Sequence, residues 1–209
     1  MKMNLPNKLT VLRLCLVPVL LLVGMLPESV LPFYVSCVIC AVLFIGTSVT
    51  DMLDGKIARK YNLITDFGKF MDPVADKFMV IGAMFVILYK FAHLRTVMIF
   101  VLIIVVFREL AVTSMRLVVS TGEGIVVAAN SLGKIKTVSQ IVAISTVFLE
   151  PVVQKGFLWI MALCGKDLGW TRIDVIPLSW LTLGFCVFMT VWSGINYLKS
   201  YWKFLDPQK

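Results

Sequence analysis

Four aspartates occur in one short polar stretch that begins directly after an apolar run. Asp51 and Asp54 are three residues apart, and Asp72 and Asp76 are four residues apart. On a helix, either spacing places both carboxylates on the same face. Ionisable groups at membrane depth are costly and are therefore candidates for function. The spacing predicts two helices that each present two carboxylates towards a shared point.

These carboxylates indicate a site for a divalent cation. Four negative charges at close range repel one another, and either proton uptake or a bound cation relieves the repulsion. Carboxylate oxygens prefer the hard cations Mg²⁺, Mn²⁺ and Ca²⁺, and Mg²⁺ commonly keeps substrate phosphates as further ligands. The alternative is that the aspartates only cap helices or face solvent. That alternative leaves their regular spacing unexplained.

Small and basic residues are interleaved with the aspartates. Gly55 and Ala58 fall on the helix face of the first aspartate pair, and Gly68 falls on that of the second pair. Residues of this size allow a bulky ligand to approach the helix closely. Arg59 and the neighbouring lysines would balance the charge of a polyphosphate.

A second polar cluster lies further along the chain. Arg108 and Glu109 interrupt an apolar run, Arg116 follows eight residues after the first arginine, and Lys134 and Lys136 come after a short loop. Several cations near a carboxylate cluster suit a second anionic group, such as a phosphate. Two simpler interpretations stay open: the lysines set membrane topology, and the first arginine pairs with the adjacent glutamate.

The composition places this chemistry in a membrane. Of the 209 residues 59% are apolar and 15% are charged, and the mean hydropathy is +0.93. An average soluble domain has about 45–50% apolar and about 25% charged residues. A disordered chain is excluded, and so is a separate soluble domain, because the spans use up the length. We expect one membrane domain over residues 1–209. The net charge of +8 then reflects positively charged cytoplasmic loops and not binding to nucleic acid.

Six apolar segments predict an all-α integral membrane protein with six transmembrane helices. Most lysines and arginines fall on the side of the N-terminus, which puts both termini in the cytoplasm. A seventh apolar segment, residues 157–164, is too short to span, and we expect a separate short helix or interfacial segment there. The predicted spans are residues 9–26, 32–57, 72–89, 96–120, 134–153 and 176–199.

The aspartate stretch resembles the signature of the CDP-alcohol phosphotransferases. The pattern D-x2-D-G-x2-A-R-x8-G-x3-D-x3-D is matched without a gap from Asp51 to Asp76. The resemblance implies six transmembrane helices, a site for Mg²⁺ or Mn²⁺ at the cytosolic interface, and a homodimer. It also implies transfer of a phosphatidyl or similar group from a CDP-linked donor to an alcohol, with release of CMP.

The resemblance also implies a role for each matched residue. Asp51, Asp54 and Asp72 would be metal ligands, and Asp76 would be the general base and a further ligand. The cytidine diphosphate would contact the small and basic residues beside them, namely Gly55, Ala58, Arg59 and Gly68.

Three further segments resemble the members of this family that use glycerol 3-phosphate as acceptor. The resemblance implies that a phosphatidyl group passes from CDP-diacylglycerol to glycerol 3-phosphate, giving phosphatidylglycerophosphate and CMP. Arg116, Lys134 and Lys136 would then bind the phosphate of the acceptor. The three segments are residues 5–13, 108–116 and 132–140.

Several alternatives remain at this point. Within the family, a cardiolipin synthase would use phosphatidylglycerol as acceptor, and other members use other alcohols. From a different class, a cation transporter would distribute its acids along a path and often show internal repeats, whereas these acids cluster. A scaffold without chemistry leaves the aspartates unexplained. We expect a multi-pass protein of the bacterial cytoplasmic membrane, in contact with membrane lipids, because no transit segment precedes the first span.

Overall fold

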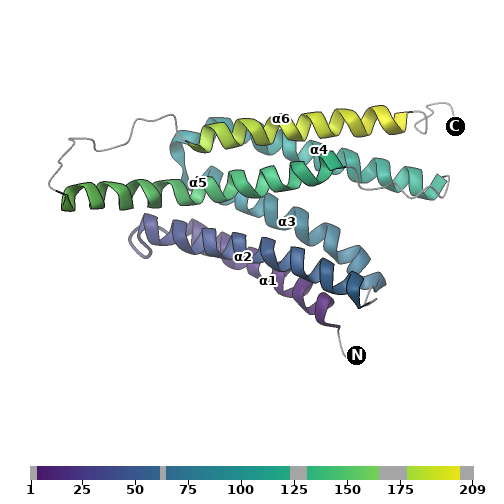
Figure 1. The fold of residues 1–209 in the computed structure, drawn as a ribbon, viewed down its shortest axis with the longest axis horizontal. Coiled ribbons are helices and arrows are strands. Elements are labelled where there is room, and N and C mark those ends of the chain that lie inside the picture. Colours follow the sequence, from purple (N-terminus) through teal and green to yellow (C-terminus); the bar gives the residue numbers. More distant parts are fainter. Residues whose placement is uncertain (1–3, 62–64, 123–130, 165–177, 203–209) are drawn as a thin grey trace.

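The computed structural model describes residues 4–61, 65–122, 131–164 and 178–202. Within these residues the chain is helical and contains no strand, which confirms the expected all-α class. Six long helices and one short 3-10 helix follow one another along the chain (Figure 1). They are α1 (Leu5–Met25), α2 (Phe33–Lys60), α3 (Asp66–Lys90), η1 (Ala92–Leu94), α4 (Arg95–Gly122), α5 (Ser131–Leu163) and α6 (Leu178–Tyr201).

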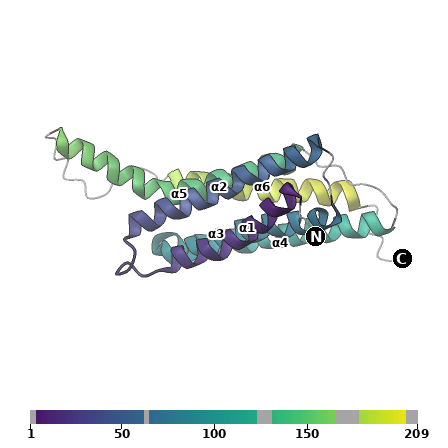
Figure 2. The same cartoon turned by 90° about the horizontal axis from the view of Figure 1, so that it is seen from below.

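The long helices form one elongated bundle, in which α1 begins and α6 ends at the same end (Figures 1 and 2). The helix α1 packs against α2 and α3, and α6 packs against α4 and α5. The helix α3 also contacts α4 and α5, so it joins the two halves of the bundle. The helix α3 is therefore in contact with helices from both the first and the last third of the chain.

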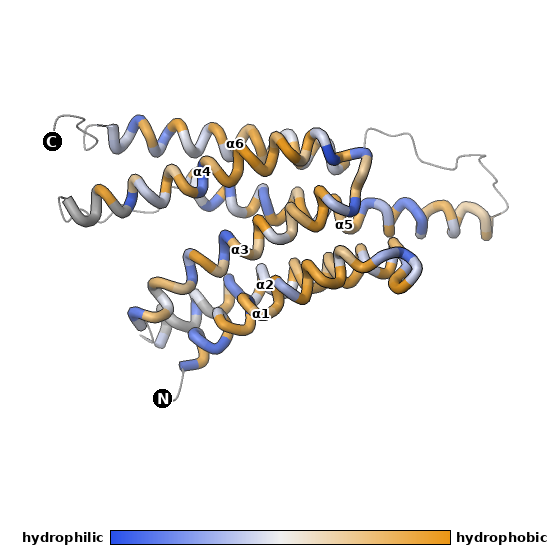
Figure 3. Tube along the Cα trace, turned by 180° about the vertical axis from the view of Figure 1, so that it is seen from behind, coloured by the Kyte–Doolittle hydropathy of each residue, from blue (hydrophilic) through white to orange (hydrophobic). Residues whose placement is uncertain are grey.

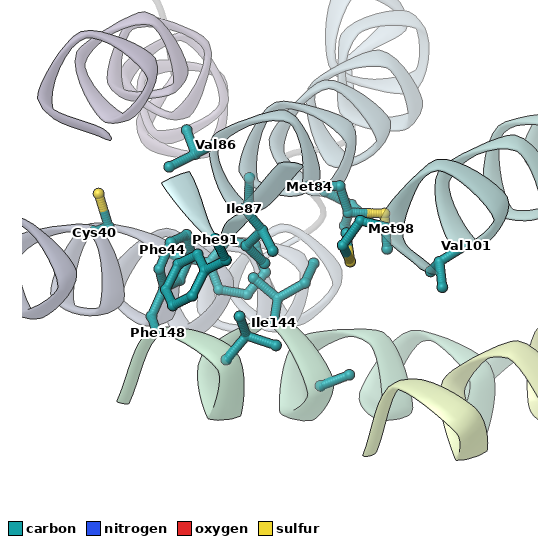
Figure 4. Close-up of a cluster of buried hydrophobic side chains, with 14 of the residues drawn as sticks. Cys40, Phe44, Met84, Val86, Ile87, Phe91, Met98, Val101, Ile144 and Phe148 are labelled. Carbon is teal, nitrogen blue, oxygen red and sulfur yellow. The ribbon is translucent and has the colours of Figure 1, made fainter. Parts of the chain in front are cut away.

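The core lies where α2, α3 and α5 meet, and it is made of aliphatic and aromatic side chains (Figure 4). Phe44, Ile87 and Phe148 are fully buried there. Between α1 and α3 the backbones approach more closely. A Cβ at Gly24 would lie 2.2 Å from Val86 Cγ1. Small residues at helix contacts are typical of membrane proteins, where close packing replaces the hydrophobic effect between helices.

Many large apolar side chains are exposed on the bundle, as lipid contact requires. Hydrophobic residues predominate along the helices (Figure 3). Five helices are long and apolar enough to cross a membrane, and α3 is the exception. Its first half carries the charged residues Asp66, Asp72, Asp76 and Lys77 among others, which lower its hydropathy. With 25 residues it is about 38 Å long. All six predicted spans therefore correspond to long helices.

The prediction of a separate short helix at residues 157–164 is wrong, whereas an interfacial location of these residues stays a prediction. The helix α5 runs without a break through Pro151 to Leu163 and projects beyond its neighbours (Figure 2). Proline is tolerated in membrane helices because neighbouring groups satisfy the freed carbonyl. At 33 residues α5 is about 50 Å long, which exceeds a hydrocarbon core of about 30 Å.

The start of α6 is fixed by a carboxylate from another helix. The backbone N–H groups of Leu178 and Ser179 donate to the two oxygens of Glu150 at 3.0 and 2.9 Å, and the Ser179 hydroxyl donates as well. The first N–H groups of a helix have no partner within it, and a negative charge there is favourable. This contact ties α6 to α5.

Candidate active site

A buried arginine joins the two aspartate helices. Arg13 of α1 is 1% exposed, and its Nη1 lies 2.7 Å from Asp51 Oδ1 on α2 and 2.7 Å from Asp76 Oδ1 on α3. A guanidinium buried in a membrane helix requires such partners. Three helices thus meet at one cationic nitrogen, and the predicted convergence of the α2 and α3 carboxylates is observed for this pair.

The first turns of α1 also position the third aspartate. The Thr10 hydroxyl donates to Asp72 Oδ1 at 2.7 Å. One turn earlier, Asn7 Oδ1 accepts from the Thr65 hydroxyl, which itself caps α3 by accepting from the Gly68 N–H. A Cβ at Gly68 would lie 3.2 Å from Asn7 Oδ1, so the Asn7 side chain would have to shift by a few tenths of an ångström. The predicted CDP-binding Gly68 therefore lies at a helix contact.

The two predicted polar clusters line one cavity of about 400 Å³. Carboxylates of α2 and α3 contribute one part of its wall, and charged residues of α4 and α5 contribute another. These segments are more than 30 residues apart in the sequence. The charged lining residues are Asp51, Asp72, Asp76, Lys77, Arg108, Glu109, Arg116, Lys134 and Lys136.

The remaining predicted residues of the aspartate stretch lie in the last turns of α2. Gly55 is half-buried and does not line the cavity. Asp54, Ala58 and Arg59 belong to α2, but their side chains lie outside the described residues. Their predicted roles in metal and CDP binding therefore stay predictions.

Two of the cations at the α4–α5 wall share one acidic partner, which offsets one of their two charges. Lys136 is 4% exposed and pairs with Glu109 Oε1. Arg108 Nη1 lies 3.4 Å from the same oxygen, and Arg108 Nη2 donates to Ser193 Oγ on α6 at 2.7 Å. The interpretation in which the first arginine pairs with its neighbouring glutamate is confirmed. Lys136, predicted to bind a phosphate, faces a carboxylate instead.

The other two cations of this wall, Arg116 and Lys134, have no acidic partner among the described residues. Arg116 and Lys134 are exposed and line the cavity, and neither forms an ion pair within the described part of the chain. Arg116 Nη2 donates to the hydroxyl of Tyr197 at 2.6 Å, and its guanidinium lies 5.1 Å from the centre of that ring. A phosphate could reach both cations from the cavity.

One neutral polar side chain adds to this wall. Gln140 is 1% exposed and lines the cavity, and its Nε2 has no hydrogen-bond partner among the described residues. A buried donor without a partner costs about 1–3 kcal/mol. A bound ligand in the cavity would offset that cost.

Comparison with known proteins identifies the family. Residues 3–166 match the family model described as CDP-alcohol phosphatidyltransferase. The chain belongs to this family. It is 39% identical to the CDP-diacylglycerol–glycerol-3-phosphate 3-phosphatidyltransferase of Bacillus subtilis, over 97% of each chain. Proteins of the same name from Haemophilus influenzae and Rickettsia felis are 33% and 32% identical, over 95% and 94% of this chain and 94% of each relative. Members of the family are enzymes, and so is this protein.

In this phosphatidyltransferase the donor set suits a divalent cation. At the α2–α3 part of the wall, three carboxylates face the guanidinium of Arg13 and the ammonium of Lys77, which leaves an excess of one negative charge there. Asp51 and Asp76 already converge on one cationic nitrogen, and their side chains are 39% and 48% exposed. Carboxylate oxygens are the usual ligands of Mg²⁺ and Mn²⁺. No group of three possible ligands close enough for an ion is found among the described residues, which omit the Asp54 side chain.

Sequence analysis missed several residues of the phosphatidyltransferase site. Arg13 ends the resembling segment 5–13, but no role was predicted for it, although a charge inside an apolar run is itself a functional signal. Thr10 carried no separate signal. Ser193 and Tyr197 lie on α6, beyond the matched residues 3–166, and only the packing of α6 against α4 places them in the site.

Proposed function

We propose that this protein transfers the phosphatidyl group of CDP-diacylglycerol to glycerol 3-phosphate, giving phosphatidylglycerophosphate and CMP. The observation that carries the proposal is the single cavity lined by α2–α3 carboxylates and by Arg116 and Lys134. Both substrates are anionic, so the donor diphosphate requires a cation at the carboxylates, and the acceptor phosphate requires the α4–α5 cations. The names of the similar proteins from three bacteria support the same reaction.

In this proposal Asp51, Asp54, Asp72 and Asp76 hold Mg²⁺ or Mn²⁺. When bound there, a divalent cation would supply positive charge to offset that of the donor diphosphate and of the departing CMP. The three carboxylates that α2 and α3 contribute to the cavity wall support this assignment. Gly55, Ala58, Arg59 and Gly68 remain the candidates for contact with the cytidine diphosphate, on the strength of the signature they share with the family.

The protein groups then carry out a displacement at phosphorus. The acceptor hydroxyl attacks the phosphorus that bears the diacylglycerol, and Asp76 takes up the hydroxyl proton. The bond from that phosphorus to the bridging oxygen breaks, and CMP leaves with the electron pair. Arg13 holds Asp76 in place from α1, and Thr10 does the same for Asp72. Positioning and charge stabilisation carry such a reaction without a covalent enzyme intermediate.

The acceptor phosphate is assigned to Arg116 and Lys134, because they are exposed in the cavity and carry no acidic partner in the described residues. Lys136 is assigned a supporting role, since its charge is balanced by Glu109. The amide nitrogen of Gln140 is a further donor to the acceptor.

The proposed location is the bacterial cytoplasmic membrane, with the cavity at the cytosolic interface and both termini in the cytoplasm. The start of α1 and the end of α6 lie at one end of the bundle, which agrees with an even number of crossings (Figure 1). The excess of basic residues predicted for that side favours the cytoplasm. A homodimer is proposed from the family resemblance.

An assay of acceptor choice tests the proposed function. The purified protein in detergent is given CDP-diacylglycerol and Mg²⁺ or Mn²⁺, with glycerol 3-phosphate, phosphatidylglycerol, serine or inositol phosphate offered separately. We expect CMP and a lipid product only with glycerol 3-phosphate, and no product from Asp76→Asn. Product with phosphatidylglycerol alone would make the protein a cardiolipin synthase. No CMP with any acceptor would overturn the proposal.

A further inference from the structure

The helix α6 places one aromatic ring against two arginines of α4, Arg108 and Arg116. Tyr197 lines the cavity and is 3% exposed. Its hydroxyl accepts from Arg116 Nη2 at 2.6 Å. The guanidinium groups of Arg116 and Arg108 lie 5.1 and 5.8 Å from the centre of the ring. One side chain thus supports two cations of the α4–α5 wall.

The contact between Arg116 and Tyr197 differs from an ion pair, because the phenol carries no negative charge. A carboxylate would hold Arg116 but would neutralise its charge, as Glu109 does for Lys136. A phenol is neutral, and the ring face attracts a guanidinium without cancelling its charge. Arg116 uses one N–H for the phenol and keeps others for a bidentate contact with a phosphate. Holding this long side chain in advance also removes part of the entropy cost of binding.

The position of Tyr197 is itself fixed by its surroundings. Arg108 donates to Ser193, one turn earlier on α6, and a Cβ at Gly194 would lie 3.3 Å from Arg108 Cγ. From α5, Gly133 lies beside the Tyr197 hydroxyl, and a Cβ there would be in van der Waals contact with that oxygen at 3.4 Å. Three helices therefore determine where this ring lies.

We infer that Tyr197 is a positioning residue that sets the affinity of the acceptor site, by orienting Arg116 while leaving its charge available to a phosphate. The inference rests on the proposed function, because it requires a phosphate-bearing acceptor at Arg116. It assigns a role in acceptor binding to α6, which lies outside the segment matched by the family model.

The test compares Tyr197→Phe with wild type in the CMP-release assay. Loss of a hydrogen bond to a charged group should raise the KM for glycerol 3-phosphate by about tenfold. The KM for CDP-diacylglycerol should change less than about twofold, because no contact to the aspartates is lost. The matched control is Tyr201→Phe, one turn further along α6, whose ring stacks on Tyr197 but does not line the cavity. This control should leave both KM values unchanged.

A double-variant cycle separates orientation of Arg116 from a general effect on the fold. In an Arg116→Ala background, Tyr197→Phe should cause no further rise in the KM for glycerol 3-phosphate. An equal rise of both KM values, an unchanged KM, or an additive effect in the double variant would overturn the inference. The wild-type assay distinguishes the two failures: if wild type does not use glycerol 3-phosphate, the proposed function has failed, whatever Tyr197 does.

Discussion

At the residue scale, the most constrained charge is the guanidinium of Arg13. It bridges Asp51 and Asp76 from inside an apolar helix, and both contacts are 2.7 Å long. Its planar group presents several donors in a fixed arrangement, which the single ammonium of a lysine cannot reproduce. The same nitrogen offsets part of the negative charge that a divalent cation is proposed to bind.

Replacement of Arg13 by glutamine is expected to lower stability and to abolish most of the activity. Breaking a fully buried ion pair costs about 3–5 kcal/mol, and the partial exposure of the carboxylates puts this case near the lower limit. Because more negative charge remains, added Mg²⁺ should raise the unfolding temperature of this variant more than that of wild type. Thermal unfolding in detergent with and without Mg²⁺ measures both effects. Arg95→Gln, at an exposed arginine that begins α4, is the control. Equal responses of variant and wild type to Mg²⁺ would contradict the proposed charge balance.

Lys134 and Lys136 should respond differently to the same substitution. Lys136→Ala leaves Glu109 without its closest partner and should cost about 2–4 kcal/mol of unfolding free energy. Lys134→Ala removes an exposed side chain and should change stability by less than about 0.5 kcal/mol, while it raises the KM for glycerol 3-phosphate. Chemical or thermal unfolding together with acceptor kinetics tests the pair. The reverse pattern would show that Lys136, and not Lys134, is the phosphate ligand.

At the element scale, the site depends on how closely α1 packs on α3. The residues Arg13 and Thr10 reach the aspartates only because the glycines Gly24 and Gly82 bring the two backbones together. Gly24 lies on α1 and Gly82 on α3. Small residues such as these let two membrane helices pack closely. The packing of α1 is therefore a condition for the chemistry and not only for stability.

An alanine at position 24 is expected to disturb this contact. Its Cβ would meet Val86 Cγ1 at 2.2 Å, so α1 or the stiff valine must shift, and overpacking of this kind costs about 1–3 kcal/mol. We expect Gly24→Ala to lower both the unfolding temperature and the turnover rate, because Arg13 moves with α1. Gly46→Ala on α2 is the control, since no atom lies within 4 Å of its added Cβ. Full activity of Gly24→Ala would show that α1 need not be held so closely.

At the scale of the whole molecule, the bundle is a membrane domain with its chemistry at one end. Hydrophobic residues predominate along the helices, and hydrophilic residues occur towards both ends of the bundle (Figure 3). The cavity is lined by charged residues of α2, α3, α4 and α5. The helix α5 is longer than the hydrocarbon core is thick, so part of it must extend out of the membrane. With cytoplasmic termini, its C-terminal end lies on the side opposite to the active site.

The cysteines allow a test of this orientation. Cys164, at the end of α5, and Cys15, inside α1, are exposed, whereas Cys37, Cys40 and Cys186 are buried. In right-side-out cells a membrane-impermeant maleimide should label Cys164 and leave Cys15 unlabelled, because Cys15 faces lipid. Labelling is followed by mass shift, with Cys164→Ser as the control. Labelling of Cys164 only from the cytoplasmic side would reverse the proposed topology.

Features that depend on the residues of one helix were predictable from the sequence, whereas features that depend on neighbouring helices were not. The presence of the six spans was predictable, because the hydropathy of each helix is a property of its own residues. The unbroken course of α5 was missed, because whether Pro151 interrupts a helix depends on the surrounding medium and on neighbouring helices.

The sequence by itself determined which side chains could do chemistry. The spacing of Asp51 and Asp54, and of Asp72 and Asp76, is a property of one helix and needs no tertiary contact. Only the tertiary structure decided which cations would be neutralised. Arg13 pairs with a carboxylate 63 residues away, and Arg116 rests on Tyr197, 81 residues away. Such pairs depend on how each helix is rotated against its neighbours, and a local spacing contains no information on that rotation.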